Sequence, residues 1–319
     1  MRLFTVFSLV AWALLAGCYG AGSSNASPGA TVRTAEFDGP LKREGAGLIF
    51  GALASNDSID YYVKGTGPNN PVGGSLSGSL ASPEGMATDA AGDLYVANTE
   101  DKIVLVYARG SNSPTATLND PGEFPADVAV APDGTVYVAN VFGPMFAPGN
   151  VVIYAPGSSS PTKTLTNKHF NHVIGVALDR NGNLFVSCNA NLGSGSGGVV
   201  EFKSGSGKGT GMHISLHAAG GVGFDRDGHL VVIDQDAAML NVYDVGNPKP
   251  IHQLALPGDA YYFAFNKEST RIYVADYGLN EIDVFRYRPS ALTLVNKITN
   301  GISASSGNIG IATTPAQQL

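Results

Sequence analysis

The amino-acid sequence predicts an all-β fold, a six-bladed β-propeller with four-stranded blades. One strand motif, in which β-branched and aromatic residues alternate with period two, recurs five times along the chain. The copies are Leu94–Asn98, Val136–Asn140, Leu184–Cys188, Leu230–Asp234 and Ile272–Asp276. Successive copies begin roughly 42 to 48 residues apart, which is the length of one propeller blade. Glycine is abundant, with 41 of 319 residues, as expected where tight turns join many short strands.

Each repeat contains four predicted strands in a constant order. The first complete unit runs through Gly85–Asp89, Leu94–Asn98, Ile103–Tyr107 and Thr115–Leu118. Three of the motif copies follow a turn of Asp-Gly or Asn-Gly, at positions 133–134, 181–182 and 227–228. Glycine at these turns supplies the positive φ that a tight hairpin requires. Five complete units follow one another from residue 83 onward.

The sixth blade is divided between the two ends of the propeller. Ile49–Leu53 and Ser58–Val63 supply its middle strands, whereas its inner strand is Gly310–Thr314, which aligns with Gly85–Asp89. We therefore expect the C-terminal strand to pair with the N-terminal blade and close the ring. Closure matters because an unpaired strand edge is a site of aggregation.

The N-terminus has the pattern of a targeting signal. A positive charge at Arg2 precedes an apolar run, Leu3–Leu15, and then small residues before Cys18. Leu15–Cys18 resembles a bacterial lipobox, which implies cleavage before Cys18 and its lipidation; the alternative is an ordinary secretory signal. We expect residues 1–17 to be a lipoprotein signal peptide, 18–44 a flexible Gly/Ser-rich tether and 45–319 the propeller. This predicts an anchored protein of the cell envelope, at the outer membrane or periplasm in a Gram-negative cell.

Charge and cysteine content exclude two further classes. The formal net charge is −7 and no block of lysine and arginine is present, so nucleic acid is not an expected partner. With Cys18 lipidated, Cys188 has no second cysteine to pair with, and we expect a buried, inert thiol. A closed ring needs no second subunit, so a monomer attached to the membrane only through its lipid is expected.

The repeat resembles the NHL-type six-bladed propeller. The family unit runs Pro-x-Gly-apolar-Ala-x-Asp, a glycine turn, Tyr-Val-Ala-Asp/Asn and Ile-x-Val-aromatic, and the segment 82–107 follows it nearly throughout. The resemblance covers about residues 45–314. The chain also resembles, more distantly, the gluconolactonase-like propeller superfamily. It implies the fold and no particular reaction, because propellers carry many unrelated activities.

The enzymatic relatives hold metal ligands just before the inner-strand glycine. In the gluconolactonase-like family these are Glu, Asn and Asp, and in the peptidyl-hydroxyglycine lyases they are His. The corresponding residues here are Glu84, Ala126, Ile174, Gly220, Tyr261 and Ile309. One carboxylate is too few for a hard cation, so we expect no metal cofactor. The alternative is a Ca²⁺- or Zn²⁺-dependent lactonase or lyase that uses Glu84, Asn140, Asp234, His172 and His217.

Loop lengths point to a binding site instead. In two neighbouring repeats the loop after the second strand is about five residues longer than in the others, and such insertions mark the binding face of repeat proteins. The first insertion contains Phe142, Met145 and Phe146, with Phe170 in a nearby connection. These aromatic residues either contact a ligand or cap the blade edge.

We therefore expect a lipid-anchored, extracytoplasmic module that binds an envelope protein or a small molecule. The predicted ligand-binding residues are Phe142, Met145, Phe146, Phe170, His172, His217 and Glu84. His172 and His217 are included because both lie in inter-blade connections shortly before an inner strand. A purely structural envelope protein is the third alternative. Asn98, Asn140, Asp234 and Asp276, at the ends of second strands, are expected to cap loops rather than bind metal.

Overall fold

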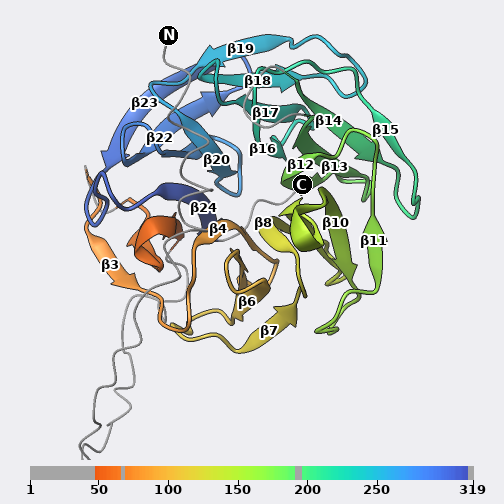
Figure 1. Cartoon of the computed structure of the whole chain (residues 1–319). Helices are drawn as coiled ribbons and strands as arrows, with labels where there is room; N and C mark the ends of the chain where they lie inside the picture. Colours follow the sequence, from red (N-terminus) through yellow and green to blue (C-terminus); the bar gives the residue numbers. More distant parts are fainter. Residues whose placement is uncertain (1–46, 66–68, 191–195, 315–319) are drawn as a thin grey trace, which may run out of the picture.

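The computed structural model describes residues 47–65, 69–190 and 196–314, which form six four-stranded antiparallel sheets. Figure 1 views these sheets as blades of a ring, with the first strand of each blade near the axis and the last at the rim. The predicted six-bladed propeller is thereby confirmed. Residues 1–46, with the predicted signal, Cys18 and most of the tether, lie outside the described residues.

The strands fall into four concentric sets. The innermost strands are β4 (Pro83–Thr88), β8 (Phe124–Val130), β12 (His172–Leu178), β16 (Ala219–Phe224), β20 (Ala260–Phe265) and β24 (Asn308–Thr314). The second strands are β1 (Leu48–Leu53), β5 (Leu94–Asn98), β9 (Val136–Phe142), β13 (Leu184–Asn189), β17 (Leu230–Asp234) and β21 (Arg271–Asp276). The third strands are β2 (Ser58–Val63), β6 (Ile103–Tyr107), β10 (Pro148–Tyr154), β14 (Gly197–Phe202), β18 (Met239–Tyr243) and β22 (Glu281–Arg288). The outermost strands are β3 (Val72–Ser75), β7 (Ala116–Asn119), β11 (Lys163–Leu165), β15 (Gly209–Gly211), β19 (His252–Ala255) and β23 (Ala291–Ile298).

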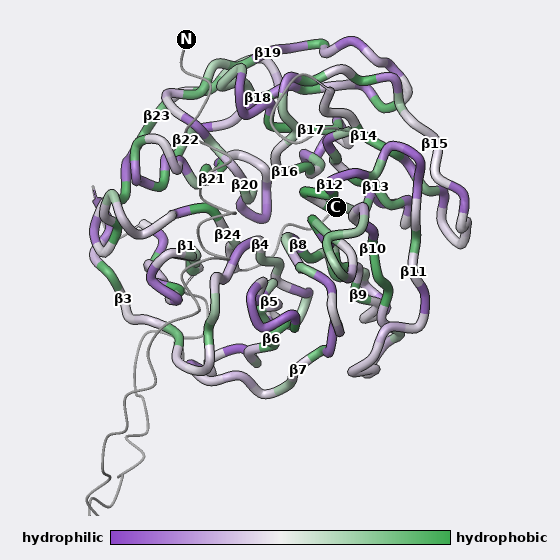
Figure 2. Tube along the Cα trace, in the orientation of Figure 1, coloured by the Kyte–Doolittle hydropathy of each residue, from purple (hydrophilic) through white to green (hydrophobic). Residues whose placement is uncertain are grey.

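The hydrophobic core lies between neighbouring blades. Second and third strands bury almost every residue, and side chains from adjacent blades form mixed clusters, for example Val138 and Tyr154 of one blade with Val104 and Leu118 of the preceding one. Inner strands such as β8 and β12 are also predominantly hydrophobic (Figure 2). Alternating apolar residues therefore build both faces of each sheet into the core, which fixes each blade against its neighbours.

The ring closes as the sequence predicts. β24 pairs with β1, with Leu48 opposite Thr314 and Phe50 opposite Ala312. The inner strands approach one another so closely that a Cβ at Gly310 would overlap the backbone carbonyl oxygen of Glu84. The glycine of the repeat is thus required by the packing of strands around the axis.

The propeller axis is filled by a tyrosine. Tyr262 of β20 points across the centre, where its hydroxyl lies 3.0 Å from the carbonyl oxygen of Ala126 and 2.9 Å from that of Ile174. Tyr262 is 5% exposed. It stands where four other inner strands have glycine, and Asp127 is the other exception. These two larger residues occupy the space that the glycines leave, so the axis is blocked at this level.

The two faces of the ring carry different loops. We call the face where inner strands begin and second strands end the upper face; it holds the short 3₁₀ segments η2 (Ala54–Asn56) and η3 (Pro144–Phe146). The lower face holds the tight turns, in which Gly134, Gly182 and Gly228 have the expected positive φ. In the described ranges, no helix has the length and apolar character needed to cross a membrane.

Candidate functional site

The aromatic loop, Pro144–Pro148, projects from the upper face between β9 and β10. All five of its residues are apolar and exposed. Met145 is 94% exposed and Phe146 is 57% exposed. Exposed groups of apolar side chains on a soluble domain characteristically mark an interaction surface. This loop is therefore the leading candidate for the binding site.

Ring packing holds the loop in place. Phe146 stacks on Phe124 with ring centroids 5.1 Å apart and meets Phe142 edge-on at 5.6 Å. The ammonium group of Lys102 lies 4.9 Å from the centroid of the Phe124 ring. Met145 and Phe146 both have left-handed backbone conformations, with φ of 58° and 60°, which non-glycine residues adopt at a cost. The loop thus presents Met145 to solvent on a base of three packed rings.

His172 supports this base from below. Its ring meets that of Phe142 edge-on at 4.9 Å and is 3% exposed. Burial lowers the pKa of His172, so the imidazole is neutral near pH 7. His172 therefore contributes aromatic packing under the predicted site and does not contact solvent.

Two other predicted site residues have different surroundings. Phe170 is 3% exposed and packs against Phe202 at 5.9 Å, so it belongs to the core of its blade and offers no surface to a ligand. His217 is exposed, and its Nδ1 lies 3.1 Å from Oδ2 of Asp234, which raises its pKa. The two histidines expected to act together have separate partners, and no hydrogen bond joins them in the described chain.

Glu84 belongs to the inner strand β4 and directly precedes its glycine, Gly85. Surrounding protein encloses its carboxyl group although water still reaches part of the residue. Burial raises the pKa of Glu84 to about 8, with a smaller contribution from the charge of Asp127, while a hydrogen bond with Thr99 opposes the shift. Tyr261, which packs edge-on against Tyr277 at 5.9 Å, lies close to this carboxyl group. Glu84 can therefore hold a proton at pH 7.

Three of the four polar residues at the ends of second strands, Asn98, Asp234 and Asp276, accept backbone N–H groups of loops, whereas Asn140 does not. Oδ1 of Asn98 accepts the backbone N–H of Ala81 at 2.8 Å. Both carboxylate oxygens of Asp234 accept the N–H of His217, and one also accepts that of Ala218. Asn140 and Asp276 differ, because each keeps one buried side-chain oxygen without a hydrogen-bond donor. Asn140 and Asp276 therefore each have one side-chain oxygen that could accept a further hydrogen bond or bind a ligand.

A cluster of possible metal ligands on the lower face is explained by its turn. Asp225, Asp227 and His229 place ligand atoms within 4.8 Å of one another. Oδ1 of Asp225 accepts the N–H groups of Asp227 and His229, and its Oδ2 lies 3.0 Å from the hydroxyl of Tyr287 and 2.9 Å from Nδ1 of His229. These hydrogen bonds stabilise the hairpin turn between β16 and β17.

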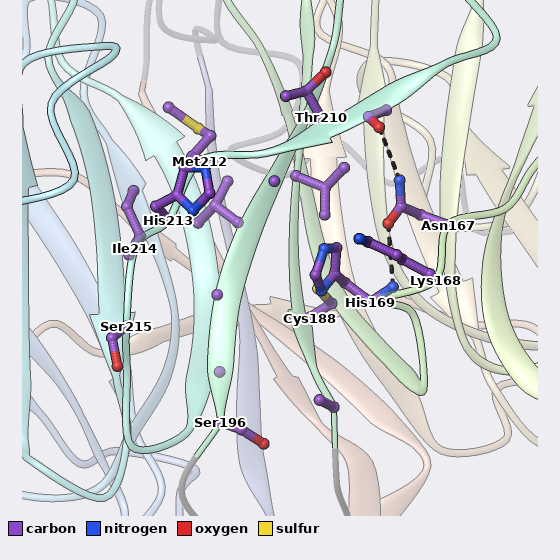
Figure 3. A pocket seen from close by; sticks show the side chains of 17 residues that line it. Asn167, Lys168, His169, Cys188, Ser196, Thr210, Met212, His213, Ile214 and Ser215 are labelled. Atoms are coloured by element: carbon purple, nitrogen blue, oxygen red, sulfur yellow. Dashed lines mark hydrogen bonds between the residues drawn. The ribbon is translucent and has the colours of Figure 1, made fainter.

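A groove of about 700 Å³ runs along the outside of the blade formed by β12 to β15. Figure 3 shows His169 and Lys168 on one side and Met212, His213 and Ile214 on the other. Its floor includes the buried thiol of Cys188, whose pKa burial raises to about 12. Such a thiol is unreactive. We favour the aromatic loop over this groove, because the described residues that line the groove include no Phe, Tyr or Trp side chain.

The groove and the axial tyrosine are features that sequence reasoning missed. The groove depends on how the connection after β11 lies beside β15, where Nδ2 of Asn167 donates to the carbonyl oxygen of Gly209 at 3.0 Å. No local pattern encodes that contact. The axial tyrosine had a signal, since Tyr262 and Asp127 break the glycine consensus of the inner strands.

The propeller is expected to be more stable at pH 5 than at pH 8. Burial raises the pKa of Glu84 to about 8 and the pKa values of Asp127 and Asp283 to about 7, the last with added repulsion from Glu281 and Asp276. Because these folded-state pKa values lie above the unfolded ones, the stabilisation is complete below about pH 4 and is lost as the pH rises to about 8. Melting temperatures measured from pH 4 to pH 8, in buffer with a chelator so that no metal ion contributes, test this pH dependence.

A matched substitution controls this pH experiment. Glu84→Gln should flatten the upper part of the melting profile, between about pH 6 and pH 8, because it removes the ionisation with the highest of these raised pKa values. A melting temperature that rises steadily from pH 5 to pH 8 in the unsubstituted protein would show that these carboxyl groups are ionised in the fold.

Comparison with known proteins supports the fold alone. No protein-family model matches this sequence, and no curated protein matches it in sequence. The structure is similar to a chain of the nidogen/laminin complex, with a TM-score of 0.70 and 13% identity over 86% of this chain and 100% of that chain. It is also similar to hydrazine synthase of Kuenenia stuttgartiensis, with a TM-score of 0.55 and 16% identity over 77% of this chain and 82% of that chain. The protein is thus a six-bladed β-propeller, and these similarities indicate its fold but not its function.

Proposed function

We propose that this protein is a binding module of the cell envelope that holds a protein partner on its aromatic loop. The observation that carries the proposal is the exposure of Met145 and Phe146 on a rigid base of packed rings. A preorganised apolar surface binds well because little conformational freedom is lost when the partner docks. A small apolar ligand at the same loop is the other form of this proposal.

The propeller fold is compatible with such a role. The similar nidogen/laminin structure is a protein complex, although a likeness at this identity extends to the fold only. The repeat motif at residues 82–107 supports membership of the NHL type as part of the proposal. A monomer without a nucleic-acid partner, and without a catalytic metal at the positions before the inner-strand glycines, completes it, in keeping with the net charge of −7.

A lipid anchor would present the aromatic loop away from the membrane. The described chain enters β1 at Leu48, on the lower face, whereas the loop lies on the upper face. The proposed anchor, Cys18 with its tether, precedes β1 in the sequence. Attachment below and binding above would leave the loop free to meet a partner in the extracytoplasmic space.

Substituting Met145 and Phe146 with serine should abolish partner capture and leave the melting temperature within a few degrees. Both side chains are largely in solvent, so their loss removes little core contact. The measurements are photocrosslinking in envelope preparations, with the crosslinker in place of Met145 and Phe146 either intact or changed to serine, and the melting temperature of the double variant. A crosslinker at Leu279, another exposed residue on the upper face, is the matched control.

The outcomes of this experiment separate the alternatives. Equal adducts at Met145 and Leu279 would contradict a specific site on the loop. A large fall in melting temperature of the double variant would instead assign Phe146 to the packing of the blade edge. An adduct at Met145 that disappears with Phe146→Ser would identify the loop as the binding surface.

A hydrolase or lyase is the second candidate, because the carboxyl group of Glu84 on the inner strand β4 holds a proton near neutral pH. Carboxyl groups with raised pKa values serve as general acids in enzymes. Against catalysis, the neighbouring positions Ala126, Ile174 and Ile309 are apolar and provide no cation ligands. Turnover of lactones that is lost in Glu84→Gln, with the fold retained, would favour the enzyme.

A further inference from the structure

A cluster of oxygen-bearing side chains lies between two blades, underneath the aromatic loop. Asp120 and Glu123 come from the connection between β7 and β8, and Asn140 and Asn150 come from β9 and β10, where they stand opposite each other. The connection touches the aromatic loop, since a Cβ on Gly122 would lie 3.3 Å from the side chain of Pro144. Four polar side chains from three segments thus converge at one blade interface.

Asp120 is buried without a hydrogen-bond donor. The residue is 0% exposed, and neither carboxylate oxygen has a hydrogen-bond partner. The Asn140 amide and the Tyr154 hydroxyl lie close enough to affect its pKa. The Tyr154 hydroxyl, however, donates to the carbonyl oxygen of Asn119 at 2.8 Å. One of the two Nδ2 hydrogens of Asn140 goes to Oδ1 of Asn150 at 3.1 Å, and the other makes no hydrogen bond to Asp120.

Asn140 adds a third unused oxygen to this interface. It is also 0% exposed, and its Oδ1 has no donor. Asn150 donates through Nδ2 to Oε2 of Glu123 at 2.8 Å, which orients the Glu123 carboxylate while leaving its other oxygen available. Glu123 is only half-buried, so it connects the enclosed oxygens with solvent. Buried acceptors without donors are costly, and native proteins satisfy nearly all of them.

The blade formed by β20 to β23 holds a similar acidic cluster that has a cation beside it, although both oxygens of Asp283 there lack a hydrogen-bond partner, as those of Asp120 do. There, buried Asp276, Glu281 and Asp283 gather at the corresponding strand ends. Lys297 forms a close ion pair with Glu281 and lies 3.9 Å from Asp283. At the Asp120 cluster the described residues supply no such cation, because the nearby Lys102 directs its ammonium group over the Phe124 ring.

We propose that Asp120, Glu123 and Asn140 bind a divalent hard cation, Ca²⁺ by preference. All available ligands are carboxylate or amide oxygens, the donor set of Ca²⁺, and no thiolate or imidazole that would select zinc is among them. Two oxygens of Asp120 and one each from Asn140 and Glu123 provide four ligands, and water entering past Glu123 completes the six to eight that Ca²⁺ takes. This inference stands apart from the proposed binding of a partner.

Two other states would satisfy Asp120 without a metal. A proton on the carboxyl group, favoured by burial and by the charge of Glu123, would remove its charge. A buried water would donate to two of the oxygens. Neither state depends on the concentration of a cation, which is the property that the experiment measures.

The test uses Tb³⁺ as a luminescent substitute for Ca²⁺ on the chelator-treated full chain. Tyr154 lies beside Asp120, so excitation of tyrosine should sensitise Tb³⁺ emission, and Ca²⁺ should suppress that emission by competition. Saturating Ca²⁺, at about 100 times its Kd, should raise the melting temperature by roughly 5 to 10 °C. Absence of both effects would overturn the proposal.

Variants locate the site. Asp120→Asn should abolish the Ca²⁺ response yet melt no lower than the parent in chelator, because it removes an unpaired buried charge. Asn140→Asp adds a carboxylate ligand and should tighten Tb³⁺ binding at least about tenfold, a gain that a purely structural role would not produce. Asp225→Asn, in the turn cluster of the lower face, should keep the response; if it instead removes the response, or if Asp120→Asn retains it, the assignment to Asp120 is wrong.

Discussion

A chain that ends after Asn300 is expected to lose the closed ring and to aggregate. The deletion removes β24, the inner strand of the divided blade, whose Ile311 and Ala312 are buried. It leaves β1 without its partner on the axial side, although all six residues of β1 are buried in the intact protein. An unpaired, apolar strand edge is a template for association with other chains.

Size-exclusion chromatography and thermal melting measure this outcome. The truncated chain should elute as large assemblies or show a melting transition far below that of the intact protein. Adding a peptide of residues 301–319 should restore a monomer, because β24 is held in the ring by backbone pairing with β1, which a separate peptide can also form. A truncated chain that stays monomeric and melts as the intact protein does would show that closure is unnecessary.

Replacing Tyr262 with alanine is expected to destabilise the propeller by about 3–5 kcal/mol, the usual cost of removing a buried aromatic side chain. Tyr262 fills the axis, where its hydroxyl reaches carbonyl groups of two blades on the far side of the ring. The glycine at 221 accommodates it, since a Cβ there would lie 3.1 Å from the tyrosine ring. The variant therefore leaves a cavity where inner strands meet.

Tyr262→Phe separates packing from hydrogen bonding. It keeps the ring and loses only the hydroxyl contact, so a cost of about 1 kcal/mol is expected. Chemical denaturation of both variants and the parent gives the comparison. Equal losses for alanine and phenylalanine would mean that the hydrogen bond, and not the filled axis, holds the centre together.

The fold was predictable because the same strand motif recurs in every complete repeat. Five copies of one motif fix the blade length, and the match between Gly310–Thr314 and Gly85–Asp89 predicts closure, which the pairing of β24 with β1 confirms. The turns at Gly134, Gly182 and Gly228 followed from the need for positive φ. Tyr262 and Asp127 depart from the glycine of the repeat, and the consensus therefore did not predict which side chains fill the axis.

The candidate site was predictable in part. Loop length and composition located Met145 and Phe146 on an exposed loop, where the structure places them. The repeat pattern put Phe170 in a connection near the loop, but its side chain turns into the core beside Phe202. The same pattern put His172 and His217 at similar positions before inner strands, but the two histidines have separate partners. Side-chain direction at a blade edge depends on the neighbouring blade, which local sequence does not specify. Part of the second predicted insertion, residues 191–195, lies outside the described residues.

The Asp120 cluster shows why polar sites between blades escape sequence reasoning. Its members stand at positions 120, 123, 140 and 150 and belong to three segments, with no motif spacing among them. Asn140 matches the other caps of the repeat in sequence, but its Oδ1 has no donor, whereas Oδ1 of Asn98 accepts a backbone N–H. Such a difference is visible once the hydrogen bonds of each blade are compared.

The pairing of Leu48 with Thr314 also determines how the molecule would respond to mechanical load. These two residues are the outer ends of adjacent antiparallel strands on the lower face. Tension applied through them would separate β24 from β1 one hydrogen bond at a time, as a zipper opens, instead of shearing all the bonds at once. The divided blade would therefore open first under tension. The other five blades would bear the force only after β24 has separated from β1.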